Sequence, residues 1–269
     1  MREHTNFGRQ TVLKKWTAAL VAIMVVLGIT ACGNSTPTAG ELIQKATDAD
    51  KTLKSYSMDV HVEQVNGIQG DSSKEEKSDI TIKTDFTKEP LGFYQDTSIV
   101  SDQTNQTIKQ YFTKEGAYSQ VNGEWAKVPD ELKSQWETNI KSQMSLTQNL
   151  DKFKPLEKDS KITVEGNEYI MTTDMSGDKG KELAKTLLSE SSGEEAAEAL
   201  GKMNVKTLTM TYGVNKETYF PTKSGFTLVL EGEENGQKIS ISMKVTSTIT
   251  KHNEVAEIKV PKDVIDNAQ

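Results

Sequence analysis

The chain has 269 residues, 35% of them hydrophobic, and a formal net charge of −7 at pH 7. An acidic protein is repelled by phosphate backbones, which argues against a role in binding nucleic acid. Cys32 is the only cysteine, so no disulfide can form within the chain and the fold must be stabilised by its apolar core.

The N-terminal segment, residues 1–31, has the layout of a secretory signal peptide. An uncharged apolar run over residues 16–29 would rise about 21 Å as a helix, which is short of the roughly 30 Å of a bilayer core. The run is therefore better interpreted as the apolar region of a signal peptide than as a permanent transmembrane helix. Four basic residues precede it: Arg2, Arg9, Lys14 and Lys15.

The segment Ile29-Thr30-Ala31-Cys32-Gly33, directly after the apolar run, resembles the lipobox of bacterial lipoproteins. The resemblance implies that the Cys32 thiol carries a diacylglyceryl group and that cleavage makes Cys32 the new N-terminus. A buried structural cysteine is the alternative. Cleavage removes 31 residues with four basic side chains and one acidic one, leaving 238 residues and a net charge of −10. Because two acyl chains anchor stably, we expect the chain on the extracytoplasmic face of the cell membrane, held by its lipid.

The residues after the cysteine, 33–40, are small and polar and include one proline, which predicts a flexible tether. The lipidated cysteine and tether would then occupy residues 32–40, and a single domain would occupy residues 41–269. At the start of that domain, apolar residues recur at intervals of three and four, which predicts a short helix. These residues are Leu42, Ala46, Ala49 and Leu53.

Five later segments alternate apolar and polar residues with a period of two, which predicts strands with one apolar and one polar face. Such strands are typical of an antiparallel sheet, because buried parallel strands are apolar on both faces. Turn sequences at residues 122–123 and 165–167 predict hairpins. The five segments are residues 56–62, 80–86, 207–214, 226–230 and 239–245.

Two helical patterns interrupt the predicted strands. Leu132, Trp136, Ile140 and Met144 are spaced by four within residues 129–147, and a second pattern covers residues 178–203, with a break near residues 191–193. Each helix has one apolar stripe and the sheet has one apolar face, so they should cover each other. We therefore predict an α+β domain, a large curved antiparallel sheet with helices packed on its inner face.

Three segments resemble parts of LolA/LppX-type lipoproteins. Residues 255–261 resemble their C-terminal strand, residues 212–221 a strand, a tight turn and a proline before the next strand, and residues 123–128 the approach to a helix. With the lipobox, the chain resembles an uncharacterised family of Gram-positive surface lipoproteins with that LolA/LppX-like fold. The resemblance implies an unclosed half-barrel of about ten or eleven antiparallel strands over helices. Several members of the fold hold acyl chains between sheet and helices, and the resemblance supplies no catalytic residues.

Patterns for catalysis or metal binding are weak in this sequence. His61 alternates with Asp59 and Glu63 on one strand face, where a metal could bind, but such a triplet is usually solvated surface. A serine nucleophile would have only His61 or His252 as its base, and Gly-x-Ser-x-Gly is absent. We therefore predict no catalytic residue, no metal site, no cofactor and no enzymatic activity.

The predicted inner face is rich in methionine, whose flexible side chain suits a pocket for irregular hydrocarbon, although the same spacing fits a packed core. The favoured hypothesis is a non-enzymatic binder or carrier of a lipid or another hydrophobic ligand. The alternative is a structural or sensory surface lipoprotein that binds an envelope protein partner, as MucB/RseB-type regulators of a related fold do. The candidate lining residues are Met58, Val60, Trp136, Met210, Leu228 and Ile241.

Overall fold

The computed structural model of the chain describes residues 36–68, 71–151, 153–192, 198, 200–201, 203–234 and 236–268. The chain divides into two compact units, Met1–Thr36 and Pro37–Gln269. The predicted signal peptide and Cys32 lie outside the described residues, so the expectations for processing and lipidation stay predictions. Within the part of the chain that is described, no helix is long and apolar enough to cross a membrane.

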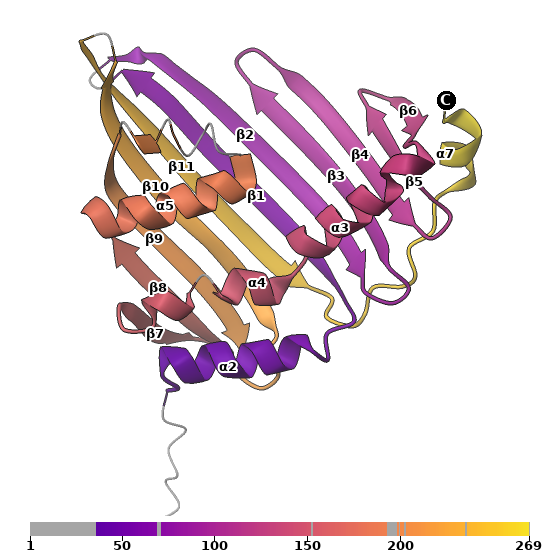
Figure 1. Cartoon of the computed structure of the whole chain (residues 1–269), viewed down its shortest axis with the longest axis horizontal. Coiled ribbons are helices and arrows are strands. Elements are labelled where there is room, and N and C mark those ends of the chain that lie inside the picture. Colours follow the sequence, from indigo (N-terminus) through magenta and orange to yellow (C-terminus); the bar gives the residue numbers. More distant parts are fainter. Residues whose placement is uncertain are drawn as a thin grey trace, which may run out of the picture. The chain divides into compact units, whose positions relative to one another are not determined.

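The second unit contains one antiparallel sheet of eleven strands, in the order β6-β5-β4-β3-β2-β1-β11-β10-β9-β8-β7 (Figure 1). Neighbours in this order are mostly consecutive in the chain, because hairpins join them. The pairing of β1 with β11 joins the two series in the middle of the sheet. The strands are β1 Ser55–Ile68, β2 Asp71–Thr87, β3 Gly92–Ser101, β4 Asn105–Thr113, β5 Gly116–Val121, β6 Glu124–Lys127, β7 Ser160–Glu165, β8 Glu168–Met175, β9 Asn204–Asn215, β10 Pro221–Glu234 and β11 Gln237–Thr250.

The five predicted strands and the two predicted hairpins are confirmed, as are the α+β class and the size of the sheet. In the hairpin between β5 and β6, Asn122 and Gly123 both have positive φ, 50° and 98°. Asparagine and glycine tolerate this left-handed conformation best, which is why the pair predicts the turn.

The helices α2 to α5 pack on one face of the sheet. Figure 1 shows α5 in front of β9–β11 and α3 in front of the lower parts of β3–β5. The helical pattern over residues 129–147 corresponds to a short 3-10 turn, α3 and the start of α4, and the second pattern to α5. The helices are α2 Ala39–Asp50, α3 Lys133–Gln143, α4 Leu146–Asp151, α5 Gly177–Ser192 and α7 Lys262–Asn267, with 3-10 turns at Asp130–Leu132 and Lys154–Leu156.

The folded unit begins earlier than the sequence predicts. The Thr38 side chain accepts a hydrogen bond from the backbone of Glu41, whose carboxylate binds the Thr38 backbone in return, and this capping box starts α2 at Ala39. Pro37 and Ala39 are buried. α2 therefore begins two residues before the predicted start of the domain at residue 41.

The C-terminal segment also differs from expectation. Residues 255–261 form no strand, although their sequence resembles one. Residues 257–259 lie instead against Pro90–Leu91 and Thr113–Glu115, at the ends of the sheet strands, and Ile258 is close to Gly92. A segment that crosses the ends of strands has no neighbouring strand with which to pair, which explains the difference. The segment brings Val260 and Val264 into contact with Tyr118 on β5.

Two main clusters of buried side chains form the core. The first cluster packs α2, α4 and α5 on β8–β10, and Leu208, Met210 and Leu228 are among its members. The second packs α3 and the start of α4 on the ends of β1–β5, where Tyr56, Phe86, Phe93 and Phe112 meet Ile140 and Met144. These clusters decide which part of the helix-covered face is filled by the protein itself.

Candidate functional site

The register of the strands identifies which side chains face the helices. The buried Tyr56 hydroxyl donates a hydrogen bond of 2.7 Å to the Met144 carbonyl at the end of α3, so Tyr56 points to the helix-covered face. Burial raises the pKa of Tyr56, with a smaller effect from the Asp50 carboxylate, so the hydroxyl remains a neutral donor. Every second residue of β1, and each residue directly opposite it, shares that face.

Following the register from Tyr56 defines a continuous apolar surface in the middle of the sheet, which we call the apolar lane. One row runs from Val245 through Val62 and Ile80 to Ile99. The next row runs from Val60 through Ile82 and Thr97 to Ile108. The lane crosses five strands, β11 to β4, which corresponds to about 19 Å at 4.8 Å per strand. Its apolar members are Val60, Val62, Ile80, Ile82, Ile99, Ile108 and Val245.

The apolar lane is not part of the packed core. Its seven apolar residues are all half-buried, and the clusters of buried residues and their packed neighbours do not include them. At the far end of the second row, Val121 lies opposite Ile108 and is 44% exposed. The helices therefore leave the middle of the apolar face incompletely covered.

The six residues predicted to line a cavity are separated by the structure. Val60 lies in the apolar lane, Met58 lies next to it on β1, and both Met58 and Trp136 pack on the second cluster. Ile241 packs on the edge of the first cluster, whereas Met210 and Leu228 are buried inside it, with exposures of 4% and 2%. Thus β9 and β10 contribute to a filled core, and the open apolar surface lies over β11 and β1–β4.

The sequence indicated part of the lane and missed the rest. Ile80 and Ile82 belong to a predicted strand, and their register with Val60 and Val62 places them in the lane. Ile99 and Ile108 lie in β3 and β4, where inward positions such as Thr97 and Gln106 are polar. This mixture weakens the alternation of two from which a strand is recognised.

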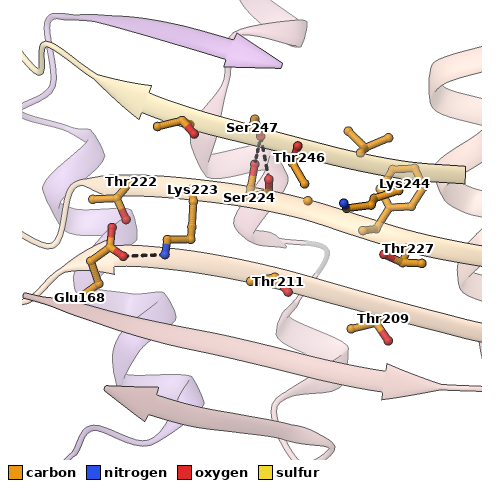
Figure 2. A pocket seen from close by; sticks show the side chains of 14 residues that line it. Glu168, Thr209, Thr211, Thr222, Lys223, Ser224, Thr227, Lys244, Thr246 and Ser247 are labelled. Atoms are coloured by element: carbon orange, nitrogen blue, oxygen red, sulfur yellow. Dashed lines mark hydrogen bonds and ion pairs between the residues drawn. The ribbon is translucent and has the colours of Figure 1, made fainter. Parts of the chain in front are cut away.

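A second concave feature lies on the opposite, outer face of the sheet (Figure 2). This hollow of about 610 Å³ is lined by Gly225 and by threonine side chains of β9–β11, including Thr211 and Thr246 on either side of the glycine. A Cβ atom at Gly225 would lie 2.2 Å from the Val245 carbonyl oxygen, so only glycine permits this close approach of the two strands.

Each charged group of the outer hollow has a partner of opposite charge. Lys223 Nζ lies 2.7 Å from Glu168 Oε2, and Figure 2 shows the pair at one end of the hollow. The hydrogen bond to Glu168 raises the pKa of Lys223. Lys244, also in the lining, pairs with Glu63 at 3.1 Å. The lining offers hydroxyl groups and paired charges and contains no histidine or cysteine.

The two histidines among the described residues, His61 and His252, both have partners. His61 Nε2 lies 2.5 Å from Asp79 Oδ2 on the exposed outer face, and His252 Nε2 donates to the Pro221 carbonyl over 2.7 Å. Among the described residues, no group of three or more histidine, cysteine, aspartate or glutamate side chains is arranged to hold a metal ion. The geometry therefore adds no support to the metal alternative for Asp59, His61 and Glu63.

The sequence identifies a family for this chain. The family of unknown function DUF6612 matches residues 38–269, so the chain belongs to that family. The match begins at the N-cap of α2 and covers the whole second unit except Pro37. A search of curated proteins found no similar sequence.

Several solved structures are similar over most of their length. A LolA superfamily protein from Nitrosomonas europaea has 9% identity and a TM-score of 0.23, over 85% of this chain and 97% of that one. A DUF1329 family protein from Desulfovibrio piger has 10% identity and a TM-score of 0.22, over 82% and 96%. An S-type phycobiliprotein lyase from Guillardia theta has 6% identity and a TM-score of 0.20, over 83% and 95%. Such low scores carry no functional argument.

The difference between filled and open regions is testable by substitution. Leu228→Phe adds volume inside the first cluster and should lower the free energy of unfolding by about 1–3 kcal/mol. Val60→Phe introduces the same ring in the half-buried lane and should change the free energy of unfolding by less than about 0.5 kcal/mol. Urea denaturation of both variants measures the difference. Equal tolerance of the two rings would show that the region under α5 is as open as the lane.

Proposed function

We propose that this protein is a membrane-anchored extracytoplasmic lipoprotein that binds a hydrophobic ligand without chemical conversion. The observation that carries the proposal is the apolar lane, seven aliphatic side chains side by side and outside the packed core. Contiguous apolar surface left incompletely covered is typical of interaction and ligand sites.

The dimensions of the lane suit extended hydrocarbon. A surface about 19 Å long and two rows of side chains wide offers contact along the whole of an acyl chain. Each methylene that leaves water for such a surface contributes about 0.8 kcal/mol. The β-branched valines and isoleucines have few rotamers, so they lose little side-chain freedom when a chain binds.

The lipobox supports the proposed location. If Cys32 carries the acyl groups, only residues 33–36 separate it from the buried Pro37. Five Cα steps span at most about 18 Å, which is shorter than a single long strand of the sheet. The binding unit would then remain at the membrane surface, where hydrophobic ligands are available.

A second candidate function is the binding of a protein partner. On the outer face, Tyr94 and Tyr111 have ring centroids 4.6 Å apart, and Tyr111 and Trp125 have centroids 5.8 Å apart. All three rings are half-buried. Tyrosine and tryptophan at a surface are enriched in protein interfaces, so this row is the surface that a partner would contact.

The anchor has a direct test. Cys32→Ala removes the only thiol, so it should abolish acylation and leave a protein that is not cut at the lipobox. Metabolic labelling with an alkyne fatty acid, followed by gel mobility, measures both effects. Cys32→Ser is the conservative control and should behave like Cys32→Ala, because a hydroxyl does not replace the thiol. Equal labelling of the variants and the natural chain would contradict the proposed anchor.

Ligand binding can be tested by substituting two neighbouring residues of β2 whose side chains lie on opposite faces of the sheet. Ile82→Gln places an amide in the apolar lane, and Thr81→Gln places the same amide on the outer face opposite His61. We expect Ile82→Gln to weaken binding of a fluorescent long-chain acyl probe about tenfold and Thr81→Gln to leave it unchanged. Probe titration with fluorescence detection measures both.

The outcome also separates the two candidate functions. Failure of the natural chain to bind any acyl probe would contradict the first. Trp125→Ala should not affect acyl binding, because Trp125 lies on the outer face with Tyr111. If Trp125→Ala abolishes cross-linking of the chain to an envelope protein and Ile82→Gln does not, the partner-binding function is favoured.

A further inference from the structure

A row of polar residues lies next to the apolar lane on the same face of the sheet. Thr84 is opposite Gln95, Gln95 is opposite Gln110, and Gln110 is opposite Ser119. Since opposite residues share a face, all four point toward the helix-covered side. We call these residues the polar row: Thr84, Gln95, Gln110 and Ser119.

The polar row lies between two rows of side chains that are apolar except for Thr97. Two positions away along the strands, in one direction, are Ile82, Thr97 and Ile108 of the lane. Two positions away in the other direction are the buried rings of Phe86, Phe93 and Phe112. A core that served only to pack would continue with apolar residues here, because an amide removed from water without a partner costs free energy. Four consecutive strands therefore place hydrogen-bonding groups between two apolar regions.

The hydrogen-bonding capacity of this row is only partly used. Gln95 Nε2 donates to Thr84 Oγ1 over 3.3 Å. Within the described part of the chain, no hydrogen bond was found for the side chain of Gln110 or for the hydroxyl of Ser119, which are both half-buried. An amide with two donors and a carbonyl, beside a hydroxyl group, can bind a ligand that has hydroxyl, ester or amide groups.

Among the described strand residues beside the lane and the polar row, no charge could balance an ionic ligand, and the nearest inward charges, Glu76 on β2 and Glu124 on β6, are exposed carboxylates. The inward positions of β1, β3, β4, β5 and β11, and those of β2 from Ser78 onward, are all uncharged in the register. The charged residues of these strands, such as Asp59, Lys83 and Asp96, are at the alternate positions on the outer face. In α3, the ammonium groups already bind elsewhere: Lys133 to the Lys114 carbonyl and Lys141 to Glu137.

A buried ionic group without a counter-charge is strongly unfavourable, whereas a neutral polar group needs only hydrogen-bond partners. We propose that the ligand is an uncharged amphiphile of the acylglycerol or acyl amide class, with its hydrocarbon on the apolar lane and its neutral polar head on the Thr84–Gln95–Gln110–Ser119 row. The inference rests on the proposed function and specifies its ligand. The polar row would select ligands by their polar heads, because the apolar lane accepts any long hydrocarbon.

The test uses photoreactive probes of one chain length that differ only in the head. Four diazirine-bearing probes are compared on membranes that contain the full chain: a monoacylglycerol, a lysophosphatidic acid, an alkyl trimethylammonium and a headless alkane. Labelling is mapped by mass spectrometry to peptides of β1–β4. The monoacylglycerol should label these peptides about tenfold more than each of the other three, which corresponds to one or two hydrogen bonds made without a burial penalty for charge.

Two neighbouring substitutions provide the matched comparison. Gln110→Leu removes the amide from the polar row and should reduce the preference for monoacylglycerol over the headless alkane to about one. Lys109→Leu removes a side chain on the outer face, where Lys109 pairs with Asp96 at 3.7 Å, and should leave the preference unchanged.

The outcomes distinguish this inference from the proposed function. Equal or stronger labelling by a charged probe, or an unchanged preference in Gln110→Leu, would overturn the neutral-head assignment while hydrophobic binding stands. If none of the four probes labels β1–β4, both are overturned. Preference for the neutral head that is lost in Gln110→Leu and kept in Lys109→Leu supports the inference.

Discussion

The structure depends on one constraint, the separation of apolar and polar side chains to opposite faces of a sheet by the period of two. Eleven strands joined in one sheet make an apolar face larger than the short helices can cover. The first core cluster fills the part of that face beneath α2, α4 and α5, and the second fills the part beneath α3. The apolar lane is what remains between them. Its existence is therefore a consequence of the ratio of sheet to helix in this chain.

The same separation keeps charge away from the lane. Along β1, the polar residues Asp59, His61 and Glu63 alternate with Met58, Val60 and Val62, and their cross-strand neighbours repeat the pattern. In these central strands the charged residues thus lie on the outer face. A single-residue shift of any central strand would bring these charges onto the lane, so burial of the apolar face also fixes the register.

The sequence predicts the fold better than the site, for reasons visible in individual residues. Strong alternation in residues 56–62 and 239–245 identifies the central strands, and Asn122-Gly123 identifies a hairpin. Alternation cannot tell Leu228, which is 2% exposed, from Val60, which is half-buried, because both are apolar residues at inward positions. That distinction depends on where the helices lie. Residues 255–261 have a strand-like sequence but form no strand, because no free strand edge is available where they pass the strand ends.

That crossing has a mechanical consequence. After β11, in the middle of the sheet, the chain runs past the strand ends beside Gly92 and Thr113 and attaches through Val260 and Val264 to Tyr118 near the β6 edge. The β2–β6 half is thus joined to the centre twice, once through its ladder of strands and once through this strap. In an unclosed sheet, bending is opposed mainly by the stiffness of the ladder itself. A strap across one end of the strands restrains that end more than the other, so flexing of the sheet should be greatest at the unstrapped hairpins.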